Sequence, residues 1–226
     1  MSPERKAVIA TGFPGTGKSM FAAYAAAHAY NNQDVERIVL LRPNVGTGPE
    51  IGFLPGDELE KTIVFHKQMI RYLCSYLNVQ EEELLGLYED GEPIVEIQSF
   101  WTLQGQDLSD ALVICDESQN MTIDEMFILA TRGAWKFICI GDTFSSQVLN
   151  PNVDNDTNGL AIFYECMGDL PYVFTINFDD ADKDIMRPGI VKDAIIRLMP
   201  KIAEIKAKKK LTQTVEIVHL NKKDDV

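Results

Sequence analysis

Eight residues near the N-terminus have the types and spacing of a phosphate-binding loop. The segment Gly12-Phe-Pro-Gly-Thr-Gly-Lys-Ser19 fits the pattern G-x-x-x-x-G-K-[ST] and lies between an expected strand and an expected helix. Glycines let the backbone wrap closely around a phosphate, so that successive N–H groups and the helix N-terminus face the anion. We expect Lys18 to reach the β- and γ-phosphates of a nucleotide and Ser19 to bind Mg²⁺. The remaining cradle residues are Gly12, Phe13, Pro14, Gly15, Thr16 and Gly17.

Two acidic residues follow a second apolar run, at 111–115. Asp116 and Glu117 stand where such a strand ends, and burying an acidic pair is costly unless a cation or a polar cleft compensates it. Asp116 fits the Walker-B role of holding Mg²⁺ through a water, and Glu117 could polarise the attacking water. The alternative is a strand that runs out into solvent.

A third apolar run, at 136–140, ends in Gly141-Asp142 and is followed by further polar residues. If this strand neighbours the strand of the phosphate-binding loop, these residues face the γ-phosphate, and Gln147 or Ser145 could act as a sensor. The alternative is a helix N-cap formed by Asp142 or Thr143.

These motifs require a scaffold in which strands and helices alternate. Apolar, β-branched runs occur at 7–10, 37–41, 94–97, 111–115, 136–140 and 172–176, and helical periodicity occurs at 18–31, 58–77, 123–131 and 183–208. The pattern predicts an α/β fold of three layers, with a mostly parallel central sheet flanked by helices, as in RecA-like P-loop NTPases. We expect one domain over 1–226, in which 201–226 form the end of a helix and a strand, Val215 to Leu220. The only hinge-like stretch is 150–158.

Composition limits the classes of partner. The 226 residues have a formal net charge of −13, and residues 51–200 carry 9 basic against 26 acidic side chains. Such a field repels nucleic acid, which would need a local basic site. We predict no membrane contact and a cytoplasmic location, because apolar runs are short and the first six residues are polar. The four cysteines and three histidines are scattered, so we predict no metal cluster ligated by the protein.

Taken together, these motifs resemble the PhoH-like proteins, P-loop ATPases similar to the first core domain of superfamily-one helicases. The resemblance covers about residues 7–190 and rests on five segments in the family order: 12–19, Leu41-Arg-Pro43, Gly52-Phe-Leu-Pro-Gly-Asp57, Ile114 to Asn120, and Gly141-Asp142. It implies Mg²⁺-dependent ATP hydrolysis linked to RNA or single-stranded nucleic acid, with Gln119 near the nucleotide. Arg187 matches a later arginine motif of the family and could serve as an arginine finger.

Size and sequence suggest partners for this unit. A translocating helicase places its nucleotide between two core domains, whereas 226 residues hold one, so a neighbouring subunit could supply Arg187. We therefore predict self-association into a ring, and the resemblance suggests a hexamer. Arg42 is the candidate contact for phosphate or base, although an ordinary ion pair is the alternative. Phe100 and Trp101 could stack on bases, but we favour core packing for Trp101. The run 206–210 could touch RNA, but we favour cations that complement a helix C-terminus.

Three other functions stay open. A phosphotransferase such as a nucleotide kinase shares the loop and sheet but would not need Glu117 to activate water. A GTPase is suggested by the segment Asn221-Lys-Lys-Asp224, which resembles a guanine-binding motif. A non-catalytic nucleotide- or RNA-binding module is supported by departures from the family pattern. These departures are the short segment before Gly12, Leu103 to Asp107 in place of an arginine-rich turn, and Ser145 in place of a glutamine.

Overall fold

A six-stranded parallel sheet forms the centre of the molecule. The structure is a computed structural model that describes residues 6–43, 45, 58–88, 91–142, 147–186 and 189–221. All strand pairings among these residues are parallel, and the strand order is β3-β2-β4-β5-β1-β6. The strands are β1 (Ala7–Gly12), β2 (Arg37–Leu41), β3 (Val95–Gln98), β4 (Ala111–Cys115), β5 (Lys136–Gly141) and β6 (Val173–Phe178). The six predicted strands are confirmed, with ends that shift by no more than two residues.

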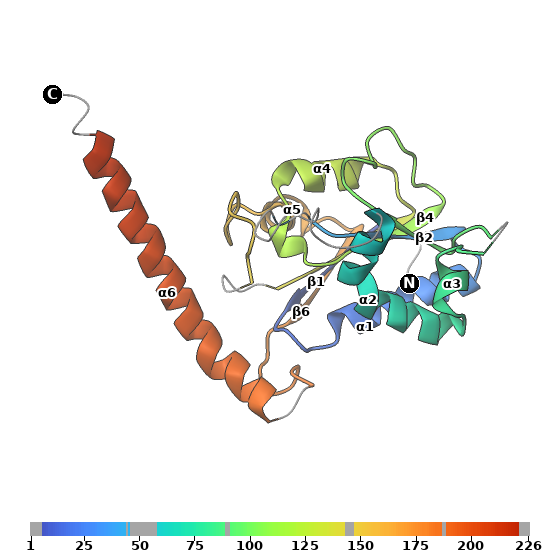
Figure 1. The fold of residues 1–226 in the computed structure, drawn as a ribbon, viewed down its shortest axis with the longest axis horizontal. Coiled ribbons are helices and arrows are strands. Elements are labelled where there is room, and N and C mark those ends of the chain that lie inside the picture. The colour runs from blue at the N-terminus through green and yellow to red at the C-terminus, as the bar shows by residue number, and fades with distance from the viewer. Residues whose placement is uncertain are drawn as a thin grey trace.

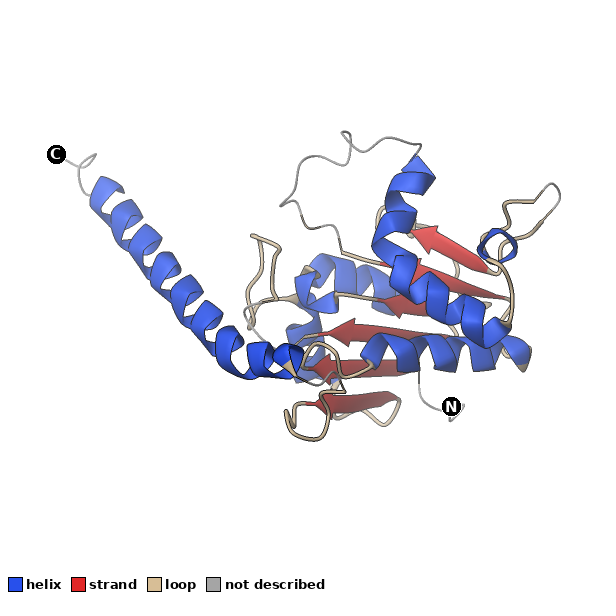
Figure 2. Cartoon of the chain, turned by 60° about the horizontal axis from the view of Figure 1, so that its bottom comes forward, coloured by secondary structure: helices blue, strands red, loops and turns tan. Residues whose placement is uncertain are grey.

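Helices cover both faces of the sheet (Figures 1 and 2). One face carries α1 (Lys18–Asn31), α2 (Glu58–Leu77) and the short α3 (Glu81–Leu84). The other carries α4 (Ile123–Thr131) and α5 (Gly159–Met167), with the short 3-10 helix η2 (Ser118–Asn120) after β4. This arrangement confirms the predicted three-layer α/β fold.

Each face of the sheet has its own apolar core. All five residues of β4 are buried, because this strand has neighbours on both sides and helices above and below. On the first face, small alanines of α1, including Ala23 and Ala26, let that helix approach the sheet closely. On the second face, Leu129 of α4 and Leu160 of α5 pack on the strands. Full burial of one such leucine contributes roughly 1.5–3 kcal/mol.

Side-chain caps fix where α4 and α5 begin. Thr122 and Glu125 form a reciprocal capping box at the start of α4, and the Asn158 side chain accepts a hydrogen bond from the Ala161 N–H at the start of α5. Asn158 and Asn150 are both buried. The hinge-like stretch expected at 150–158 is therefore an ordered connection that leads directly into α5.

The C-terminal part differs most from the expectation. Helix α6 spans Ile190–Asn221 and extends away from the rest of the protein (Figure 1). The predicted start at Lys183 is wrong, because residues 181–184 form a turn in which the Asp184 carboxylate accepts a hydrogen bond from the Asp180 N–H. The predicted strand at 215–220 is also wrong, because α6 continues through it. Among the described residues, no helix is long and apolar enough to cross a membrane.

Candidate functional site

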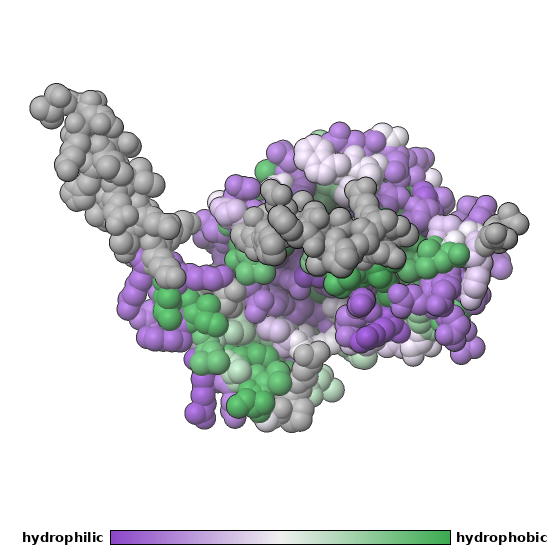
Figure 3. Space-filling model, in the orientation of Figure 1, coloured by the Kyte–Doolittle hydropathy of each residue, from purple (hydrophilic) through white to green (hydrophobic). Residues whose placement is uncertain are grey.

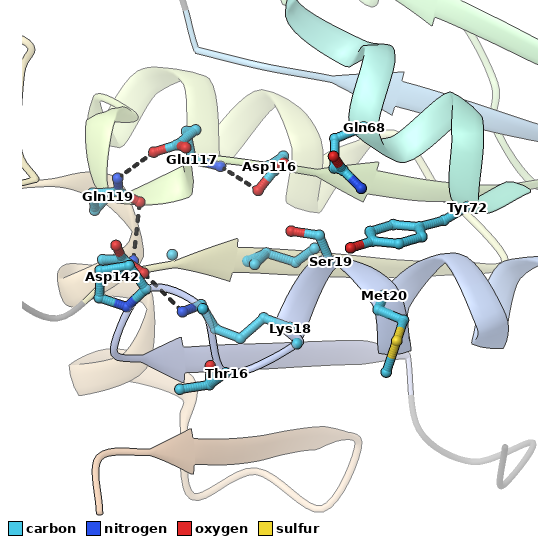
Figure 4. Close-up of a pocket in the computed structure, with 15 residues that line it drawn as sticks. Thr16, Lys18, Ser19, Met20, Gln68, Tyr72, Asp116, Glu117, Gln119 and Asp142 are labelled. Carbon is cyan, nitrogen blue, oxygen red and sulfur yellow. Dashed lines mark hydrogen bonds and ion pairs between the residues drawn. The ribbon is translucent and has the colours of Figure 1, made fainter. Parts of the chain in front are cut away.

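The strand order brings the predicted site residues to one edge of the sheet. β1 pairs with β5, and β5 pairs with β4, so the carboxyl ends of these three strands are neighbours. The loop after β1, the acidic pair after β4 and Asp142 after β5 line one cavity of about 190 Å³ (Figure 4). Ligands of open parallel sheets bind at this edge.

The loop after β1 depends on its glycines. Gly12, Gly15 and Gly17 have φ angles of 135°, 77° and 90°, which residues with side chains rarely adopt. A Cβ atom on Gly12 would lie 2.1 Å from the carbonyl oxygen of Phe178 in β6. The next residue, Phe13, donates its N–H to the same carbonyl at 2.8 Å. The edge strand β6 therefore holds the start of the loop, which leads into the N-terminus of α1.

Lys18 is buried at the centre of this loop. Its Nζ donates to the carbonyl oxygens of Gly12 at 3.0 Å and Phe13 at 2.6 Å, and it forms an ion pair with Asp142 Oδ1 at 2.8 Å. Burial raises the pKa of Asp142, and the neighbouring ammonium only partly offsets this increase. A cation fixed at the base of a glycine-rich cradle suits a phosphate ligand.

Asp116 is a strongly perturbed carboxyl group. Burial, together with the charges of Glu117 and Asp142, raises its pKa from 3.8 to about 6. The Glu117 N–H, which donates to Asp116 Oδ1 at 2.9 Å, acts in the opposite direction, as does the charge of Arg42. The Asp116 carboxylate and the Ser19 hydroxyl line the same cavity, and both are oxygen donors of the kind that Mg²⁺ prefers. The residues present therefore fit the predicted metal.

Glu117 is held in an unusual conformation. Its φ and ψ angles are 57° and 35°, in the left-handed region, where a residue with a side chain is uncommon. Its carboxylate accepts a hydrogen bond from Gln119 Nε2 at 2.7 Å and lies 3.6 Å from Arg42 Nη2. The backbone turn and these two partners fix the side chain at the cavity.

Gln119 links the ends of β4 and β5. Besides Glu117, its side chain donates to the Gln147 carbonyl oxygen at 3.3 Å and accepts from the Asp142 N–H at 3.1 Å. Gln147 therefore meets this network through its backbone rather than through the side chain we expected to act as a sensor. The adjacent Asn120 Oδ1 accepts from the N–H groups of Leu149 at 2.6 Å and Asn150 at 3.1 Å, which anchors the same loop.

The two candidate nucleic-acid contacts lie in different settings. Arg42 donates to the Phe65 carbonyl oxygen at 2.8 Å, and its guanidinium lies 5.9 Å from the centre of the Phe65 ring. Arg42 also contacts Glu117 and so joins the cavity to α2. The alternative of an ordinary ion pair therefore applies to Arg42, and its partner is an acid that lines the cavity. Trp101 is 80% exposed, so the core packing we favoured for it is wrong; its neighbour Phe100 is buried instead.

Some predicted residues lie outside the described part, and some site residues were not predicted. Arg187, Thr143, Ser145 and the loop 46–57 lie outside it, although the Met186 N–H donates to the Gly15 carbonyl oxygen at 3.3 Å. Gln68 and Tyr72 of α2 also line the cavity, although we did not predict them from the sequence. The only sequence signal for them is their spacing of four residues, which places both on one face of a helix.

The sheet, the loop and the acidic strand end define a P-loop NTPase fold. A family model described as PhoH-like protein matches residues 1–199. The PhoH-like protein of Bacillus subtilis (strain 168) is 35% identical over 177 residues, which cover 77% of this chain and 53% of that protein. The PhoH-like protein of Mycobacterium leprae (strain TN) is 34% identical over 190 residues, covering 83% and 52%. The Protein PhoH of Escherichia coli (strain K12) is 34% identical over 128 residues, covering 57% and 36%.

The chain therefore belongs to the PhoH-like protein family, as its motifs suggested. It spans about half, or less, of the length of these curated relatives.

Proposed function

We propose that this protein binds ATP with Mg²⁺ and hydrolyses it. One observation carries the proposal: Lys18 and Ser19 of the loop share a single cavity with Asp116 and Glu117 of the acidic strand end. A phosphate-binding loop alone would bind a nucleotide. The addition of two carboxylates on the neighbouring strand supplies what hydrolysis further requires, namely a metal position and a group that can accept a proton from water.

Each residue has a distinct role in this proposal. The backbone N–H groups of the loop and the Lys18 ammonium bind the phosphates, while Ser19 holds the metal directly and Asp116 holds it through a water. When bound, Mg²⁺ neutralises phosphate charge. Glu117 orients the attacking water and accepts its proton, because its contacts with Gln119 and Arg42 hold the carboxylate at the cavity.

Phosphate release tests this proposal directly. We would measure it from ATP and from GTP, with Mg²⁺ or with EDTA, for the wild type, Lys18→Ala and Glu117→Gln. The matched control is Glu165→Gln, which neutralises an exposed acid on α5. We expect Mg²⁺-dependent turnover in the wild type and the control, with a loss of about 100-fold or more in both site variants.

The same assay separates the alternatives. Consumption of ATP only when a phosphate acceptor is added would indicate a phosphotransferase. Binding without turnover would indicate a non-catalytic module. A preference for GTP would favour the GTPase reading, whose motif extends beyond Asn221, the last described residue.

We further propose that turnover is linked to RNA or single-stranded DNA in the cytoplasm. Trp101 offers an exposed aromatic face after β3, and Arg42 is a cation at the edge of the nucleotide cavity. Each nucleic acid would be added to the phosphate-release assay over a range of salt concentrations. Stimulation that weakens with salt supports the proposal, and unchanged turnover with both polymers contradicts it.

We also propose a ring of identical subunits, with six as the expected number. Helix α6 exposes Leu198, Ile202 and Ile205. Figure 3 shows apolar surface on the part of this helix that adjoins the rest of the protein. The exposed Lys201 and Lys208 flank these residues and are both paired with Glu204, so two positive charges and one negative charge lie beside the apolar side chains. A second copy offers complementary charge, because residues 51–200 carry 26 acidic and 9 basic side chains.

Light scattering on the eluted protein tests this assembly. Leu198→Asp with Ile202→Asp should convert the oligomer to monomers, whereas Ile196→Asp, equally exposed on another side of α6, should leave it intact. A wild-type monomer at micromolar concentration would refute the proposed ring.

Subunit mixing then tests the role of Arg187. Lys18→Ala and Arg187→Ala are each expected to be inactive. If the arginine acts across the subunit interface, a mixture of the two regains turnover, because some interfaces combine an intact loop with an intact arginine. If a mixture that has exchanged subunits stays inactive, the arginine does not act between subunits.

A further inference from the structure

Two neutral polar side chains of α2 enter the nucleotide cavity. Gln68 and Tyr72 belong neither to the phosphate-binding loop nor to the acidic strand end, yet both line the cavity with Ser19 and Asp116. They are one helical turn apart and so lie on the same face of α2. Figure 4 shows both on the α2 side of the cavity, with the hydroxyl end of Tyr72 directed toward Ser19.

The packing of α2 holds these two side chains in place. Met69, Ile70 and Leu73, which alternate with them along the helix, are buried in the core against α1 and the sheet. One turn further on, Tyr76 packs edge-on against Tyr24 of α1, with ring centres 5.5 Å apart. The helix therefore presents Gln68 and Tyr72 from a fixed support rather than from a loop.

Neither polar group is used by the fold. Among the described residues, no hydrogen bond joins the exposed Gln68 carboxamide or the hydroxyl of the half-buried Tyr72 to another group. A polar group at a cavity wall that has no protein partner is available to a ligand or to ordered water. Both groups can donate and accept hydrogen bonds, and neither carries charge.

We propose that Gln68 and Tyr72 form the outer shell of the metal site and hydrogen-bond the waters of the Mg²⁺ ion that Ser19 and Asp116 hold. This inference rests on the proposed function. Mg²⁺ gives up its waters reluctantly and usually keeps several of them when a protein binds it. Neutral donors and acceptors suit such waters, whereas phosphate oxygens call for cations and backbone N–H groups, which the loop already provides.

The position of the pair favours the metal over the phosphates. The hydroxyl end of Tyr72 is directed toward Ser19, a metal-ligand candidate (Figure 4), whereas the Lys18 ammonium, which lines the same cavity, is held by Asp142 and by carbonyl groups of the loop. Outer-shell partners orient a metal's ligands, and their loss typically weakens metal affinity 10- to 100-fold. Gln68 and Tyr72 are thus positioning residues for the metal.

A binding measurement tests this role without relying on turnover. A fluorescent, non-hydrolysable ATP analogue would be bound in EDTA and then across a series of Mg²⁺ concentrations, for the wild type, Tyr72→Phe and Gln68→Leu. Tyr72→Phe removes one hydroxyl and keeps the ring, so the fold should be retained. Tyr76→Phe is the matched control, since it removes the same group one turn away.

The expected result is a shift in metal dependence alone. Both variants should need roughly 10- to 100-fold more Mg²⁺ for half-maximal enhancement of binding, with unchanged affinity in EDTA. The control variant, Tyr76→Phe, should need the same Mg²⁺ concentration as the wild type. An unchanged Mg²⁺ midpoint in both variants would overturn the inference, as would weaker binding in EDTA, which would instead indicate a contact with the nucleotide itself. Absence of any Mg²⁺ effect in the wild type would refute the proposed metal site as a whole, and thus differs from a failure of the outer shell alone.

Discussion

Replacing Asp116 by Asn should stabilise the protein at neutral and alkaline pH while abolishing its proposed activity. The environment of Asp116 raises its pKa from 3.8 to about 6, chiefly through burial. A shift of about 2 units corresponds to about 3 kcal/mol of unfavourable free energy when the group is ionised in the folded protein. Asparagine keeps an oxygen that can accept the Glu117 N–H and carries no charge, so this cost disappears.

The pH dependence of this effect has a definite sign. The folded protein binds the Asp116 proton more tightly than the unfolded chain does, so ionisation destabilises the fold. The cost is complete above about pH 6, declines as the pH falls from about 6 to 3.8, and is absent below 3.8. Asp116→Asn should therefore raise the free energy of unfolding by about 3 kcal/mol at pH 8 and by about a third of that at pH 4.5.

Thermal unfolding followed by circular dichroism measures this gain. For a chain of this size, about 3 kcal/mol corresponds to an increase in Tm of roughly 6–12 °C. Mg²⁺ should raise the Tm of the wild type, because it binds the ionised carboxylate. The difference in Tm between the wild type and Asp116→Asn should therefore become smaller. The control is Asp169→Asn, an exposed acid after α5, which should change little. An unchanged or lower Tm for Asp116→Asn at pH 8, or the same gain at both pH values, would refute the reasoning.

Three further predictions concern the loop, its support and the exposed tryptophan. Gly12→Ala should lower the free energy of unfolding by about 1–3 kcal/mol more than Gly105→Ala, because both positions have positive φ but only Gly12 faces a backbone oxygen; equal losses in urea unfolding would contradict this. Asn120→Ala should leave two backbone N–H groups of the 149–150 segment without their partner, which should lower the stability of this segment by about 1–3 kcal/mol for each group. Limited proteolysis at 147–158 should therefore become faster. Unchanged cleavage would contradict the anchoring role of Asn120. Trp101→Ala should change stability by less than about 0.5 kcal/mol yet weaken binding of single-stranded RNA by about 1–3 kcal/mol, and fluorescence titration showing equal RNA affinity would exclude the stacking role.

Local sequence patterns were sufficient for most of the fold. The helix at 123–131 and the strand at 111–115 have the predicted ends, because helical periodicity marks the helix and a run of apolar, β-branched residues marks the strand. The short α5 was not predicted, since its start depends on Asn158 in a stretch whose composition resembles a loop. At 215–220, β-branched residues predicted a strand, but a strand also requires a neighbour to pair with, and α6 continues instead.

The site was predictable where one motif contains the chemistry and not where separate elements meet. Lys18, Ser19, Asp116 and Glu117 lie in recognisable segments that the strand order brings together. The Lys18–Asp142 ion pair depends on β5 lying beside β1, which no local pattern reveals. Gln68 and Tyr72 reach the cavity only because α2 packs on α1, and the exposure of Trp101 likewise depends on tertiary packing.

We propose that one cavity binds and hydrolyses Mg²⁺-ATP, with Glu117 activating water. The most direct test is a single-turnover experiment with γ-labelled ATP on the wild type and Glu117→Gln, in which bound nucleotide and released phosphate are measured in the same samples. We expect both proteins to bind ATP with Mg²⁺, and only the wild type to release phosphate at an appreciable rate. Equal phosphate release by the two proteins would contradict it.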